Sequence, residues 1–148
     1  MSAGQDEKTG QNIFGRYQAG LQNVGSYQVS GVPFVSGSDN LDAGVEHKIE
    51  FGAVAKKVTI RNPGAVDIRV HFASTGSGNV YSGGHFLRVS GSSGQTKTIN
   101  ELTLNVKCKE IYVSNNTSTA NAAYEVLAEL TGIARERMFV LTGSGITE

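Results

Sequence analysis

The sequence predicts an all-β protein, built as an antiparallel β-sandwich of about eight strands. Glycine occurs 19 times against only two prolines, and valine and threonine are frequent. This composition favours short strands joined by tight turns over packed helices. Short stretches of alternating apolar and polar residues also recur along the chain at spacings of roughly 8 to 15 residues. Such regular short strands are typical of a sandwich, and a count of about eight favours a jelly roll.

The 148 residues suit a single domain. The first residues are polar and lack any periodicity, which predicts an extended N-terminal arm over residues 1–25 and one β-sandwich domain over residues 26–148. Glycines at positions 15 and 20 make a helix in the arm poor, since each costs about 1 kcal/mol relative to alanine. Four apolar side chains nevertheless punctuate the arm: Ile13, Phe14, Tyr17 and Leu21.

The clearest local pattern predicts a β-hairpin. Residues 56–61 and 66–72 both alternate, and between them lies the turn sequence Asn62-Pro63-Gly64. Ile68 and Val70 then face the core, whereas Arg69 and His71 lie on the face exposed to water.

Further strands are predicted at residues 26–35, 47–51, 85–89, 96–99, 102–113, 122–133 and 138–142. In the strand at 102–113 the apolar alternation continues only if it slips by one residue at Lys109 or Glu110, which predicts a β-bulge. The side chains expected to face the core are Val58, Ile60, Val66, Ile68, Val70, Phe72, Val106, Cys108, Tyr124, Val126 and Leu130.

The charge balance bears on the partners of the chain. Thirteen basic and thirteen acidic residues give a net charge of zero, so no long-range field attracts nucleic acid, and we expect no direct binding to it. The polar N-terminus lacks the apolar core of a signal peptide, and no apolar run reaches the roughly 18 residues of a membrane span. We therefore expect no membrane partner. A single cysteine cannot form an internal disulfide, which is compatible with folding in a reducing cytosol.

The sequence contains no recognisable catalytic or metal-binding pattern. His47, His71 and His85 are far apart and none has a partner at metal-ligand spacing. Cys108 lies on an apolar strand face, where a buried hydrophobic role is expected, not that of a nucleophile. We therefore expect no enzyme activity, no cofactor and no bound metal.

The two chain ends are the candidate partner-binding regions. The apolar arm and the predicted last strand can dock on neighbouring chains, or each can pack on its own domain, and the sequence leaves both open. The candidate partner-binding residues are Ile13, Phe14, Tyr17, Leu21, Met138, Phe139 and Leu141.

Four segments of the chain resemble small virion structural proteins of tailed phages and large icosahedral DNA viruses. These segments are residues 14–31, 67–72 (Asp67-Ile68-Arg69-Val70-His71-Phe72), 106–113 and 141–147. The resemblance implies a capsid decoration or cement protein, or a single jelly-roll protein at a vertex. It further implies synthesis in the host cytoplasm, a place in the virion, contacts with the major capsid protein or other virion proteins, and homo-oligomers.

A carbohydrate-binding β-sandwich is the alternative function. Tyr81 and Tyr112 would then supply the flat rings on which sugars stack. Tryptophan is absent and aromatic residues make up only 7% of the chain, so this reading has less support.

Overall fold

The computed structural model describes residues 32–76, 80–92 and 100–140. The predicted arm lies outside these residues, so its prediction stays a prediction. The described chain confirms the all-β antiparallel class, with seven strands that belong to one hydrogen-bonded sheet. The strands are β1 (Pro33–Leu41), β2 (Glu46–Asn62), β3 (Ile68–His71), β4 (Leu87–Val89), β5 (Asn100–Leu104), β6 (Cys108–Ser114) and β7 (Ala122–Leu130).

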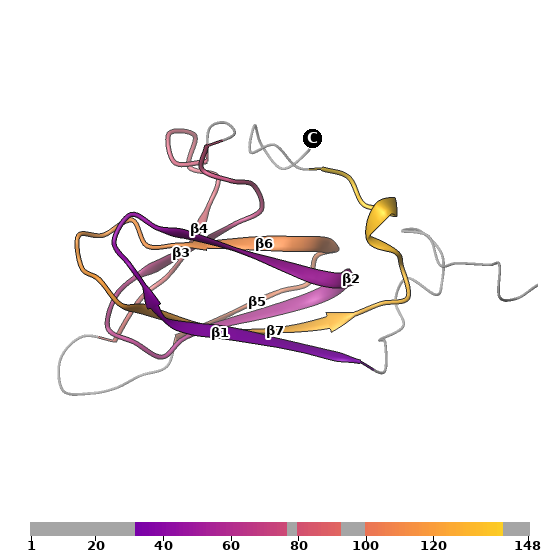
Figure 1. Cartoon of the computed structure of the whole chain (residues 1–148), viewed down its shortest axis with the longest axis horizontal. Helices are drawn as coiled ribbons and strands as arrows, with labels where there is room; N and C mark the ends of the chain where they lie inside the picture. Colours follow the sequence, from indigo (N-terminus) through magenta and orange to yellow (C-terminus); the bar gives the residue numbers. More distant parts are fainter. Residues whose placement is uncertain (1–31, 77–79, 93–99, 141–148) are drawn as a thin grey trace, which may run out of the picture.

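The sheet folds over itself into two layers because one long strand is shared between them (Figure 1). The first half of β2 pairs with β6, followed by β3 and β4. Its second half pairs with β7 on one side and with β5 on the other, and β1 lies outside β7. One layer therefore has the order β1-β7-β2-β5 and the other the order β2-β6-β3-β4.

The strand β2 changes layers at an irregularity between Glu50 and Ala55, where its register with β6 is interrupted. Ala55 is the pivot, since it pairs with Cys108 of β6 and also with Leu130 of β7. The backbone of Val54, just before the pivot, bonds instead to residues after β7: its N–H donates to the Ile133 carbonyl at 3.0 Å. The apolar alternation of β6 slips near residue 109 as predicted, since Cys108 and Ile111 are both buried, but the β-bulge predicted there is wrong: the extra residues lie in β2, where residues 51–54 face residue 109.

The predicted hairpin is wrong. β3 pairs with β4 and β6 and not with β2, so the turn at residues 62–64 connects the two layers. The buried side chain of Asn62 fixes this crossing, since its Nδ2 donates to the carbonyls of Val66 at 2.8 Å and Val89 at 3.0 Å. Alternation thus identified the faces of both strands correctly, but it carried no information about which strands are neighbours.

The core lies between the two layers. Most of the residues predicted to face it are buried, namely Val58, Ile60, Ile68, Val70, Cys108, Tyr124, Val126 and Leu130. Val66 and Phe72 are partly buried and pack against the core. The prediction for Val106 is wrong, as this side chain is 38% exposed. The reason is that the predicted strand 102–113 breaks into β5 and β6, and Val106 lies in the connection between them.

One helical element occurs within the described ranges, the short 3-10 helix η3 (Arg135–Arg137), which follows β7. This part of the chain has no helix with the length and apolar character needed to cross a membrane. The predicted terminal strand is wrong over residues 138–140, which form no ladder, while residues 141 and 142 lie outside the described residues. The Thr131 N–H donates to the Val54 carbonyl, and the Val54 N–H donates to the Ile133 carbonyl. These two hydrogen bonds hold the chain at the β2 bend, where it leaves the sheet.

Candidate functional site

The candidate partner-binding residues fall mostly outside the described chain: Ile13, Phe14, Tyr17, Leu21 and Leu141. Of the two that remain, Met138 is partly buried and Phe139 is 63% exposed. The neighbouring Val140 is also exposed. The described C-terminal segment therefore presents apolar side chains to solvent, although it is not the strand that the sequence predicted.

A second apolar surface, which the sequence analysis missed, lies on the outer face of the β1-β7-β2-β5 layer. Val35 of β1 lies directly opposite Leu127 of β7, which in turn lies opposite Thr59 of β2. The side chains of Val35 and Leu127 are 73% and 45% exposed. They line an open hollow of about 680 Å³. We call these three residues the apolar strip.

Paired charges border the apolar strip on both sides. Lys57 lies 3.8 Å from Glu129 on one side, and Arg61 lies 3.6 Å from Glu125 on the other. These ions neutralise one another, so the surface around the strip has little net charge. A partner that covers the strip would gain mainly from apolar burial and only weakly from charge.

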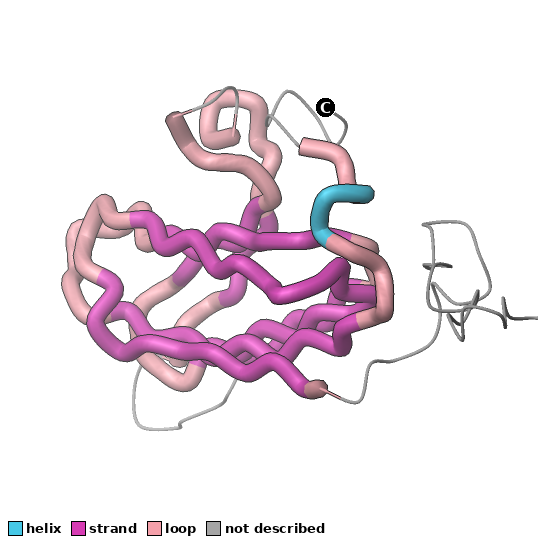
Figure 2. Tube along the Cα trace, turned by 45° about the vertical axis from the view of Figure 1, so that its right-hand side comes forward, coloured by secondary structure: helices cyan, strands magenta, loops and turns pink. Residues whose placement is uncertain are grey.

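The outer face of the other layer is covered by the loop that follows β3 (Figures 1 and 2). The sequence predicted that His71 points away from the core, and its direction is correct, because Ile68 and Val70 on the same strand face inward. The prediction of an exposed histidine is wrong, since His71 is only 1% exposed. The ring of Tyr81, from the covering loop, meets it edge-on at 6.1 Å between centroids.

Hydrogen bonds fix the protonation of the buried histidine. His71 Nδ1 lies 2.7 Å from the carbonyl oxygen of Ala73, which can only accept, so Nδ1 carries the proton. Nε2 then accepts from the Ser114 hydroxyl at 2.9 Å. The Tyr81 hydroxyl donates to the same serine oxygen and thereby ties the covering loop to β6.

A carboxylate on β2 holds the beginning of the same loop. Glu46 accepts hydrogen bonds from the Ser74 hydroxyl at 3.0 Å and from the Thr75 backbone N–H at 2.9 Å. It also lies 3.7 Å from His71 Nε2. The ring of Tyr112 stacks on His71 with only 5° between the planes. These contacts, which we call the His71 network, pin the loop onto the layer.

The His71 network joins a serine to a neutral histidine, a pairing that activates nucleophiles in hydrolases. Here the serine is not accessible, because Ser114 is 2% exposed and its hydroxyl already bonds to both His71 and Tyr81. The histidine Nδ1 also bonds to a backbone carbonyl, where a catalytic triad would place a carboxylate. The arrangement therefore acts on the position of the loop.

Burial lowers the pKa of His71 below its usual value, and the nearby Arg69 charge adds to this effect, although the Ala73 bond and Glu46 oppose it. The unfolded chain therefore binds more protons than the folded chain below about pH 6.5, so the folded state loses stability as the pH falls through that range. Between pH 7.5 and pH 5.5 the free energy of unfolding, measured by chemical denaturation, should fall further for the native chain than for His71→Gln.

Tyr112→Phe is the matched control for this experiment, because it keeps the histidine and the stacked ring and removes only an outer hydroxyl. It should retain the native pH dependence. If His71→Gln and the native chain lose the same stability between the two pH values, His71 is not the group that titrates.

Two other candidate groups have structural roles. Burial raises the pKa of Cys108 to about 12, so its thiol stays protonated at neutral pH, as expected of a core residue. His47 bonds through Nδ1 to the Tyr124 hydroxyl at 2.9 Å. Among the described residues no three histidine, cysteine, aspartate or glutamate side chains group together as a metal site.

The two tyrosines proposed as sugar platforms are engaged with protein groups. Tyr112 lies against His71, with the Lys48 ammonium 6.0 Å from its ring centre. The Tyr81 ring has the Arg69 guanidinium 4.8 Å from its centre. Protein groups thus occupy part of each ring, which leaves less open aromatic surface for sugar stacking.

The sequence also gave no indication of the role of Arg135 in η3. Its guanidinium donates to the carbonyls of Phe51 and Lys109, each at 2.6 Å. These carbonyls lie where β2 changes layers and the β2–β6 ladder is interrupted. Arg135 also lies 3.4 Å from Glu110. It therefore supplies the hydrogen bonds that the interrupted ladder cannot.

No family model and no curated protein matches this sequence.

Proposed function

We propose that this chain is a non-enzymatic virion structural protein that binds the capsid shell or forms part of it, as a decoration, cement or vertex component. The observation that carries the proposal is the strand order. If the bent β2 is counted as two consecutive strands, the layers pair in the order 1-8-3-6 and 2-7-4-5. This order supports an eight-stranded jelly roll, an architecture that viral capsid proteins use and that lectin domains share.

The position of the chain ends supports assembly through them. β1 begins at Pro33, which pairs with Glu129 near the end of β7. The chain therefore enters β1 close to the end of β7, and after β7 it leads through η3 to the exposed apolar residues Phe139 and Val140. Exposed apolar groups near a chain end suit contacts with neighbouring chains in a shell.

The charge of the chain suggests how such contacts work. A net charge of zero gives little long-range attraction, so specificity rests on apolar anchors and strand pairing at short range. Ordering an arm costs conformational entropy, which keeps a single contact weak. Many copies on one particle together hold firmly, and this multivalency suits a cement or vertex protein and the homo-oligomers expected of it.

The proposal is tested by asking whether the chain is part of a particle. The full chain should be present at constant stoichiometry in virus particles purified from its native source, measured by mass spectrometry and electron microscopy. Its absence from such particles overturns the proposal.

Deletion of residues 1–24 tests the arm. The truncated chain should keep its β-sheet circular dichroism, because β1 begins only at Pro33, but it should no longer join the particle or the oligomer. Deletion of residues 1–10 is the control, since it removes the polar leader and keeps all four anchors. If the longer deletion assembles with unchanged stoichiometry and salt resistance, the arm is not the connector, and the apolar strip becomes the next surface to test.

A further inference from the structure

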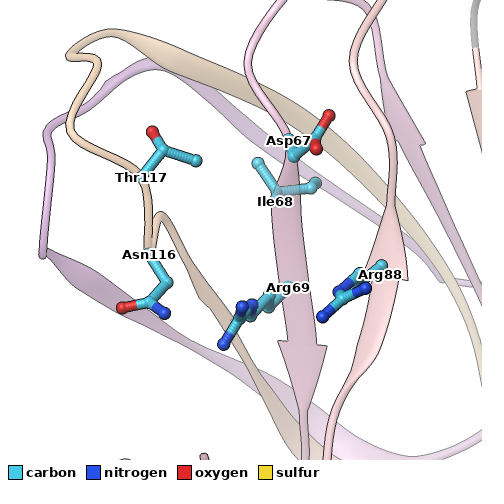
Figure 3. Close-up of a pocket in the computed structure, with 6 residues that line it drawn as sticks. All are labelled: Asp67, Ile68, Arg69, Arg88, Asn116 and Thr117. Atoms are coloured by element: carbon cyan, nitrogen blue, oxygen red, sulfur yellow. The ribbon is translucent and has the colours of Figure 1, made fainter.

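Two arginines face each other on the outer face of the layer that contains β3 and β4. Arg69 of β3 and Arg88 of β4 are direct cross-strand partners, so their side chains leave the same face of the sheet (Figure 3). Like charges in this position repel each other and destabilise a ladder. Their juxtaposition therefore needs a compensating interaction.

Aromatic rings of the covering loop supply part of the compensation. The Arg69 guanidinium carbon lies 4.2 Å from the centre of the Phe86 ring, and that of Arg88 lies 5.7 Å from the same ring. Phe86 packs edge-on against Tyr81, which the His71 network holds in place. Both guanidinium groups are thus held against a fixed aromatic support, which lowers the entropy cost of binding a ligand.

Neither guanidinium has an ion-pair partner within the part of the chain that the structure describes. The nearby Asp67 is occupied elsewhere, because its Oδ1 accepts a hydrogen bond from the Gly91 N–H at 2.7 Å. Figure 3 shows its carboxylate directed away from Arg69. The forked N–H donors of Arg69 and Arg88 are therefore left without a carboxylate, the group they bind best.

A small cavity lies beside the two arginines. Its volume is about 170 Å³. Asp67 and Ile68 line it on the side of the arginines, and Asn116 and Thr117 from the loop after β6 form its opposite wall. The Thr117 hydroxyl donates to Asn115 Oδ1 at 2.6 Å, which fixes this wall. Asn116 faces Arg69 across the cavity (Figure 3) and adds a side-chain amide that can donate to an oxygen. The cavity has room for the end of one acidic side chain.

We propose that Arg69, Arg88 and Asn116 bind the carboxylate of an aspartate or glutamate on a partner protein. The carboxylate chemistry follows from the paired guanidinium groups. The choice of a protein as its source rests on the proposed virion function, and it is favoured because the aromatic faces that a sugar would need already carry the arginines. A net charge of zero disfavours a nucleic-acid phosphate as the ligand.

The test is a nuclear magnetic resonance titration of the full isotope-labelled chain with a short acidic peptide, acetyl-Gly-Glu-Gly-Asp-Gly-amide. The same peptide with glutamine and asparagine in place of the acids is the control ligand. The Nε–Hε signals of Arg69 and Arg88 should shift saturably with the acidic peptide alone. Arg88→Gln should raise the Kd about tenfold or more, the effect of losing one charge-assisted fork.

A second measurement separates binding from a structural role. Arg88→Gln should leave the Tm without ligand unchanged or higher, because it removes the repulsion between like charges. Arg137→Gln, which removes an exposed arginine in η3, should leave peptide binding intact. The site is overturned if both variants weaken binding equally, if Arg88→Gln lowers the Tm, or if the uncharged peptide binds as well. It is also overturned as a protein site if inorganic phosphate or sialyllactose binds more tightly than the peptide.

The titration needs no virus particle, so its outcome does not depend on whether the proposed function is correct. A chain that binds the peptide but is absent from purified virus particles overturns the virion proposal and keeps the site. A chain that is present in particles but does not bind the peptide overturns the site and keeps the virion proposal.

Discussion

Phe51→Ala should lower the free energy of unfolding by about 3 to 5 kcal/mol, the range for removing a large aromatic side chain from a core. Phe51 is 1% exposed and packs edge-on against Phe34, with ring centroids 5.0 Å apart. It lies at the point where β2 passes between the layers, so its loss affects the packing of both. Urea denaturation followed by circular dichroism measures the effect.

Phe139→Ala is the matched control, because it deletes the same side chain from a position that is 63% exposed. Its effect should stay within about 0.5 kcal/mol. Equal losses at the two positions would contradict the described burial, and a loss below about 1 kcal/mol at Phe51 would show that the bend repacks without it.

Arg135→Met should lower the free energy of unfolding by about 2 to 3 kcal/mol. The variant keeps an unbranched apolar stem but removes the charge-assisted hydrogen bonds to the carbonyls of Phe51 and Lys109. Each hydrogen bond that involves a charged group contributes about 1.5 to 3 kcal/mol to stability. The expected loss of stability is smaller than the sum for the two hydrogen bonds, because the Arg135 side chain is 26% exposed and water can replace part of what is removed.

Arg135→Lys separates charge from geometry. Lysine keeps one charged nitrogen, but it lacks the planar guanidinium, in which Nη1 donates to both carbonyls while Nη2 lies 3.4 Å from Glu110. Its stability, from the same urea denaturation, should fall between those of the native chain and Arg135→Met. If the lysine variant equals the native chain, charge alone explains the role of Arg135, and if the methionine variant equals it too, water satisfies both carbonyls.

Local patterns predicted the faces of the strands well. The direction of His71 and the burial of Ile68 and Val126 follow from alternation, because the side-chain period of a strand is a purely local property. The slip of the alternation near residue 109 follows in the same way, although the extra residues behind it lie in β2. Sequence alternation alone therefore sufficed for the class of fold and for most of the core.

Features that depend on distant contacts could not be predicted in this way. His71 is buried because Tyr81 and its loop cover the layer, and nothing in the residues next to His71 indicates that cover. The hairpin prediction failed because β3 pairs with β4 and β6, while Asn62 bonds to Val66 and Val89 where the chain crosses between the layers. The position of Arg69 opposite Arg88 could not be predicted either, because the sequence does not show that β3 pairs with β4.

The place of β7 in the sheet has a consequence for synthesis on the ribosome. β7 is the last strand of the described chain, yet it lies between β1 and β2, the first two. Within the described residues β7 is the only hydrogen-bonded partner of β1, so β1 stays unpaired until nearly the whole domain has left the exit tunnel. Its edge is then open to other nascent chains, which favours aggregation. The pairing of β1 must therefore wait for β7, whereas β2 and β5 of the same layer can pair before β7 is made.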